Sequence, residues 1–137
     1  MGAAALLTSL KTERRIRAGV AESGFASFET VAAERIGGRM GLPFVGQAFA
    51  SNGLLYLRLR YGFDLKDLPP AAAAAPPILF IHGLLDNETL PEHSRALHRR
   101  YPNSALWEVE NAMHCGAFEA APAEFRRRVL DWLGEVP

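Results

Sequence analysis

The sequence is poor in the features that mark several large protein classes. It has a single cysteine, Cys115, which excludes an intrachain disulfide and fits a reducing compartment. Its 15 basic residues are balanced by 15 acidic ones, so no excess positive charge argues for nucleic acid or for an anionic membrane surface. No apolar run approaches the ~20 residues that a membrane-spanning helix needs. We therefore expect no nucleic-acid partner and no membrane span in this chain.

Targeting and cofactor patterns are also missing. Residues 1–10 are apolar, but their charged neighbours follow them, which is the wrong order for a signal peptide. We therefore expect a cytoplasmic protein, unless a signal or anchor precedes this sequence. No Cys/His cluster has zinc-ligand spacing, and no glycine-rich loop after a strand has a phosphate-binding pattern. The sequence implies neither a metal nor an organic cofactor.

What is present is the composition of a soluble globular chain. Of the 137 residues, 49% are hydrophobic and 22% are charged, and the length allows one domain at most. Apolar runs bounded by turn residues predict three strands, at 16–21, 78–81 and 104–109. Helical spacing, capping residues and prolines predict five helices, at 3–12, 28–36, 49–60, 91–100 and from 122 onward.

Several boundaries rest on glycine and proline. Ser27 is the expected cap of the helix at 28–36, and the pair Gly37-Gly38 is expected to end that helix. The segment 41–46, which contains a proline, is expected to be a loop. The segment 64–77 is rich in proline and alanine, and we interpret it as a connector within a single domain at 1–137.

Strands that alternate with helices predict an α/β fold with a parallel sheet. In such sheets, chemistry gathers in the loops beyond the carboxyl ends of the strands. Two expected loops qualify here, 82–90 and 110–116, and each contains one candidate catalytic group. Because the loops follow consecutive strands, the two groups can meet at one edge of the sheet.

The candidates are Asp86 in the first loop and His114 in the second. A carboxylate fixed just past a strand can orient an imidazole, although Asp86 could equally be a helix cap or a turn residue. An imidazole titrates near neutral pH and suits a general base, although His114 could instead be a surface histidine. His82, next to the strand, is expected to be structural, with Gly83 giving the turn backbone freedom.

At this point the sequence resembles the α/β-hydrolases. The run PILFIHGLLD from Pro77 to Asp86, followed by LPEHS at 90–94 and by Leu97, is similar to the acid-bearing segment of the esterase-like and peptidase-like members. In that family the acid and then the histidine follow the last strands, and the nucleophilic serine precedes both. The resemblance implies that Asp86 is the acid of a catalytic triad.

Three other segments extend the resemblance over nearly the whole chain. They are the histidine loop, with His114, Gly116 and Phe118; ESGFAS at 22–27, similar to the segment after the family's sixth strand; and MGAAALL at 1–7, similar to the residues that follow the nucleophilic serine. The resemblance implies that His114 is the triad base, and that the full-length protein cleaves a small-molecule ester or amide. It implies a partial α/β-hydrolase fold with about the family's last three strands.

The departure from the family is the nucleophile, because the sequence contains no G-x-S-x-G motif. We expect an inactive C-terminal portion of a serine hydrolase. The first alternative is a non-catalytic α/β module that associates through the exposed strand edge from Ile16 to Ala21. The second is a small enzyme that uses Cys115 as its nucleophile. For the portion of a serine hydrolase and for the non-catalytic module alike, an apolar edge strand predicts self-association.

Overall fold

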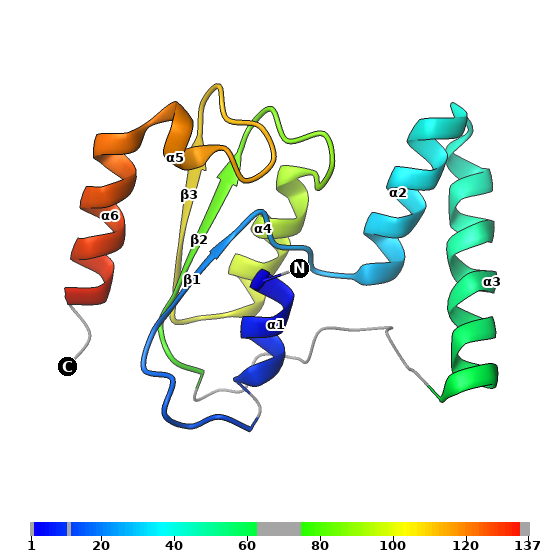
Figure 1. Ribbon diagram of the computed structural model, residues 1–137, viewed down its shortest axis with the longest axis horizontal. Helices are drawn as coiled ribbons and strands as arrows, with labels where there is room; N and C mark the ends of the chain where they lie inside the picture. The colour runs from blue at the N-terminus through cyan, green and yellow to red at the C-terminus, as the bar shows by residue number, and fades with distance from the viewer. Residues whose placement is uncertain (1, 11, 63–74, 135–137) are drawn as a thin grey trace. The chain divides into compact units, whose positions relative to one another are not determined.

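The computed structural model describes residues 2–10, 12–62 and 75–134 (Figure 1). The chain divides into two compact units. Met1–Phe25 and Pro69–Pro137 form the first unit, which contains the sheet, and Ala26–Leu68 form the second unit, which contains a helical hairpin. The first unit holds both candidate catalytic residues.

The sheet of the first unit has three parallel strands in the order β1-β2-β3. They are β1 (Gly19–Glu22), β2 (Ile78–Gly83) and β3 (Ser104–Val109). Gly19 pairs with Ile78, and Ile78 pairs with Ser104, so the three strands start level with one another. Every residue of β2 is buried, as expected for a central parallel strand covered on both faces.

Helices cover the two faces of this sheet (Figure 1). They are α1 (Gly2–Ser9), α4 (Pro91–Arg100), the short α5 (Ala117–Ala120) and α6 (Pro122–Gly134). Leu79 and Ile81 lie in one apolar cluster, against which Phe125, Val129 and Trp132 of α6 pack. Phe80 points to the opposite face, where its ring centroid lies 5.9 Å from that of Tyr101 at the end of α4. Successive side chains of β2 therefore pack against helices on opposite faces of the sheet.

The second unit consists of α2 (Phe28–Met40) and α3 (Pro43–Tyr61). Ser27 caps α2 by accepting a hydrogen bond from the backbone N–H of Thr30, as the sequence predicts. The two helices approach so closely at Gly46 that a Cβ there would lie only 2.1 Å from the carbonyl oxygen of Ala33. Glycine is therefore required at this contact.

The first strand differs from its expected range of 16–21. Residues 16–18 lie outside the strand, and β1 begins at Gly19, whose N–H donates to the carbonyl of Pro77. Pro77 itself has no N–H, so it cannot donate the next hydrogen bond of the ladder back to the segment before Gly19. The pairing therefore starts at Gly19, and β1 continues to Glu22, one residue beyond the expected end.

The helical hairpin differs at its connection. The pair Gly37-Gly38 was expected to end α2, but the helix continues to Met40 and ends at Gly41, which has a φ of 65°. Gly37 instead serves close packing, since a Cβ there would lie 2.9 Å from the Cα of Pro43. The expected loop at 41–46 is also wrong beyond its first two residues. Pro43 is the first residue of α3, where a missing N–H costs nothing.

The other strands and helices of the first unit agree with the expected bounds in part. α4 and β3 have the predicted bounds, and β2 extends two residues past the predicted Ile81. α5 was not predicted, and it lies directly after the loop at 110–116. Most of the connector at 64–77 lies outside the described residues. In the described part of the chain, no helix is both long enough and apolar enough to cross a membrane.

Candidate active site

The candidate site lies where β2 and β3 end. Their loops are joined by two backbone hydrogen bonds, from Leu84 N–H to the Val109 carbonyl and from Leu85 N–H to the Ala112 carbonyl, each 2.9 Å long. Gly83 allows this contact, because a Cβ there would lie 2.3 Å from the Ala112 carbonyl oxygen. The requirement at Gly83 is thus space for a neighbouring backbone, and not the conformational freedom expected from the sequence.

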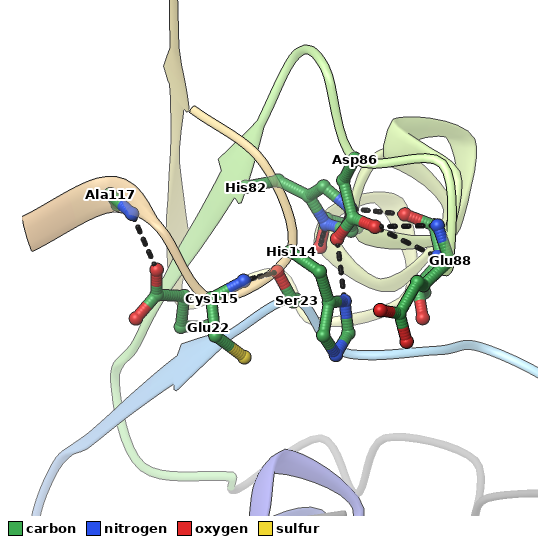
Figure 2. Close-up of polar contacts among 10 residues, drawn as sticks. Glu22, Ser23, His82, Asp86, Glu88, His114, Cys115 and Ala117 are labelled. Atoms are coloured by element: carbon green, nitrogen blue, oxygen red, sulfur yellow. Dashed lines mark hydrogen bonds and ion pairs between the residues drawn. The ribbon is translucent and has the colours of Figure 1, made fainter. Parts of the chain in front are cut away.

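Asp86 and His114 meet across these loops (Figure 2). Nδ1 of His114 lies 2.9 Å from Oδ2 of Asp86. The other carboxylate oxygen, Oδ1, accepts hydrogen bonds from the N–H groups of Glu88, at 3.0 Å, and Thr89, at 2.9 Å. The Asp86 side chain is fully buried, whereas 29% of the His114 side chain is exposed. The carboxylate is fixed by the fold, and the imidazole reaches the surface.

The environment of Asp86 favours its ionised form. Burial by itself would raise the pKa of this carboxyl. Hydrogen bonds from the N–H groups of Thr89 and Glu88 and from the side chains of His114 and Ser23 oppose burial and outweigh it. The pKa of Asp86 is therefore lowered, and the group stays a carboxylate at neutral pH.

This lowered pKa predicts an acid-dependent loss of stability. The contribution of Asp86 to the free energy of unfolding is fully present above the ordinary aspartate pKa of about 3.9, and it is lost as the pH falls through the lower folded-state value. We expect urea unfolding midpoints to decline below about pH 4, with a smaller decline in Asp86→Asn. A ¹³C NMR titration of the Asp86 carboxyl carbon checks whether protonation of Asp86 causes this decline. A midpoint at or above the ordinary value would contradict the prediction.

The contact also fixes the tautomer of His114. A carboxylate can only accept a hydrogen bond, so the proton of a neutral imidazole must lie on Nδ1. Nε2 then carries a lone pair, and in the described part of the chain no residue hydrogen-bonds to it. Figure 2 shows the ring edge that bears Nε2 pointing away from Asp86. The ring is thus oriented to take a proton at Nε2 from a group outside the pair.

His82 is structural, as expected. Its side chain is fully buried, and its Nε2 lies 2.7 Å from the carbonyl oxygen of Thr89, to which it must donate. Nδ1 then accepts from the hydroxyl of Ser94 on α4. Nε2 also lies 3.3 Å from Oδ2 of Asp86. His82 therefore links β2, the acid loop and α4, and it has no exposed nitrogen for catalysis.

Two residues of the site were not assigned a role from the sequence, Glu22 and Ser23 at the end of β1. Oγ of Ser23 accepts a hydrogen bond from the N–H of Cys115, at 3.1 Å, and Oε1 of Glu22 accepts one from the N–H of Ala117, at 2.9 Å. The available signal was positional, because β1 ends beside β2 and parallel strands end at the same edge.

Cys115 is poorly placed to act as a nucleophile. Burial raises the pKa of its thiol, and so do the nearby carboxylates of Glu22 and Asp86, while the Ser23 hydroxyl opposes them only in part. The reactive form of cysteine is the thiolate, so a raised pKa makes the group less nucleophilic at neutral pH.

In the described residues, no group of three metal-ligating side chains lies close enough together to hold a metal ion.

Superposition on solved structures of other proteins identifies the fold of this chain. No protein-family model matches the sequence, and no curated protein matches it either. Among solved structures, an esterase from Pyrococcus furiosus superposes with a TM-score of 0.71 at 23% identity, over 99% of this chain and 51% of the esterase. An epoxide hydrolase from Bacillus megaterium, solved as its M145A mutant, gives 0.61 at 15% identity, over 98% and 66% of the two chains.

A thermophilic esterase from Thermogutta terrifontis also matches, with a TM-score of 0.57 at 18% identity, over 98% of this chain and 62% of the esterase. The chain spans about half the length of the Pyrococcus furiosus enzyme. These proteins share the α/β-hydrolase fold, and the three parallel strands with their flanking helices match that fold in part. The chain therefore has a partial α/β-hydrolase fold.

Proposed function

We propose that this chain carries the acid and the base of a serine hydrolase that cleaves an ester or amide by acyl transfer. The observation that carries the proposal is the contact between Oδ2 of Asp86 and Nδ1 of His114, with the carboxylate buried and the ring partly exposed. The similar solved structures include esterases, which supports hydrolysis as the class of reaction.

The proposed chemistry follows from the orientation of the ring. The hydroxyl of a serine attacks the substrate carbonyl while Nε2 of His114 takes the hydroxyl proton, which His114 later delivers to the leaving group. Asp86 holds the proton on Nδ1 and stabilises the imidazolium that forms, without taking the proton itself. The lowered pKa of Asp86 suits this role, because the group must remain negative while the ring is charged.

The serine itself has to come from outside these residues. The sequence has no G-x-S-x-G motif, and among the described residues the hydroxyl of Ser23 bonds the N–H of Cys115 and not the ring of His114. The 137-residue chain is therefore proposed to lack a complete triad. The DNA upstream of Met1 provides a direct check, since a reading frame that continues into G-x-S would supply the missing half.

This proposal predicts how activity depends on chain length. The 137-residue chain should hydrolyse p-nitrophenyl acetate and butyrate no faster than a His114→Ala control. A longer protein with a G-x-S-x-G elbow ahead of residue 1 should be active, because removal of the nucleophile normally costs on the order of 10⁶ in kcat. Steady-state release of p-nitrophenol measures both. Hydrolysis by the short chain that is lost in Cys115→Ala would identify Cys115 as the nucleophile instead.

A second candidate is a non-catalytic module that associates through β1. In the described part of the chain β1 pairs only with β2, and the N–H groups of Gly19 and Ser23 point toward β2. Alternation along the strand turns the backbone groups of Val20 and Glu22 toward the other side, where a further strand could pair. An inactive longer protein, together with a 137-residue chain that sediments as a dimer, would favour this candidate over the hydrolase.

A further inference from the structure

The end of β1 approaches both loops that carry the acid–base pair (Figure 2). Ser23 directly follows β1 and has a φ of 48°, in the left-handed region that a residue with a side chain rarely adopts. Only 6% of Ser23 is exposed. A strained, buried, polar residue at a strand end needs a compensating contact, and its hydroxyl makes one that matters here.

The Ser23 hydroxyl holds the backbone that follows the base. Its Oγ accepts a hydrogen bond of 3.1 Å from the N–H of Cys115. The hydroxyl therefore ties the end of β1 to the residue immediately after His114.

Glu22 adds a second attachment to the same segment. Its carboxylate accepts a hydrogen bond from the N–H of Ala117, the first residue of α5. Cys115 has a φ of 54°, so the chain directly after His114 also adopts a left-handed conformation that costs free energy. The bonds to residues 115 and 117 hold this turn in place.

We infer that Ser23 is a positioning residue that sets the orientation of His114 relative to Asp86, and that Glu22 is its second anchor. The inference rests on the proposed function, in which His114 is the base and Asp86 the acid. Without the hydroxyl, the Cys115 N–H loses its partner. The loop can then relax from its strained turn, and Nδ1 is no longer held on the carboxylate.

NMR of ¹⁵N-histidine-labelled protein tests this directly on the 137-residue chain. The wild type should show His114 as the tautomer protonated on Nδ1. Ser23→Ala should convert that signal to a mixture of tautomers and speed hydrogen exchange of the Cys115 amide by about tenfold. Wild-type ring shifts and wild-type Cys115 exchange in Ser23→Ala would overturn the inference.

Two further variants separate loss of the hydroxyl from misfolding. Ser23→Gly removes the hydroxyl but tolerates the left-handed φ, so it should fold and show the same change at His114. Ser104→Ala is the matched control, because Ser104 Oγ also bonds a histidine ring, that of His98, at the opposite end of the sheet. It should leave the His114 signals unchanged. A Ser23→Gly spectrum like that of the wild type would likewise refute the positioning role.

Enzyme kinetics keep this inference separate from the proposed function. In an active longer protein, Ser23→Gly should lower kcat about tenfold with little change in KM, since the lost hydrogen bond orients the base and does not bind substrate. If the longer protein is inactive while the NMR changes occur, the proposed function fails and the positioning role stands. If it is active and Ser23→Gly changes neither kcat nor the spectrum, the positioning role fails alone.

Discussion

His114→Ala is expected to lower kcat by about 10⁵ in a longer protein that supplies the proposed G-x-S-x-G elbow. The variant removes the group whose Nε2 would accept the serine proton, while the remaining site can still bind substrate. KM for p-nitrophenyl butyrate should therefore change far less than kcat. Steady-state kinetics of the purified variant measure both constants. A loss of less than tenfold would show that the imidazole is not the base.

Asp86→Asn in the same protein separates the two members of the pair. Its amide can donate a hydrogen bond to Nδ1 of His114, which favours the wrong tautomer, and a loss on the order of 10⁴ is expected. His98→Gln is a control on the same unit, because His98 bonds Ser104 near the start of β3. It should retain kcat. A protein in which Asp86→Asn and His98→Gln behave alike would exclude a catalytic role for the acid.

Gly83→Ala is expected to lower the stability of the site strongly, with about 3 kcal/mol lost from the free energy of unfolding. The added Cβ would lie 2.3 Å from the Ala112 carbonyl oxygen and 2.7 Å from that of Met113. Both are backbone atoms, so neither can move aside without moving the loop that presents His114. The bonds from the first residues after Gly83 to the same loop would weaken with it.

Urea unfolding of the 137-residue chain measures this effect, and Gly53→Ala is its control. Gly53 lies inside α3, and a Cβ there would meet no atom of a neighbouring element within 4 Å, so alanine should raise helix stability by up to about 1 kcal/mol. The expected order of midpoints is Gly53→Ala, wild type, then Gly83→Ala. A wild-type midpoint for Gly83→Ala would mean that the two loops do not approach as closely as the structure has them.

Much of the sheet and the meeting of Asp86 with His114 could be predicted because the signals are local. A continuous apolar run marks β2, and Pro91 fits only the first turn of α4. Once the strands are parallel and consecutive, their loops must share one edge. The order of acid and histidine then indicates which side chains meet there, although it gives neither their distance nor the burial of the carboxylate.

The parts that could not be predicted depend on distant partners. The Ser23 hydroxyl binds an N–H 92 residues away, and the Glu22 carboxylate binds one 95 residues away, so neither contact leaves a pattern in the neighbouring sequence. The pair Gly37-Gly38 shows the same limit. A glycine that ends a helix and a glycine that lets a second helix approach look identical until the second helix is placed.

The three segments of the site, near residues 22, 86 and 114, have a consequence for folding kinetics. They are joined only when all three strands have paired, and closing such long loops is a slow, entropically costly step. Helices such as α4 can form early, because their contacts are local. The bonds from the end of β1 to the turn after His114 thus form only at the last stage of assembly, and a chain that has not reached that stage would lack the complete geometry of the site.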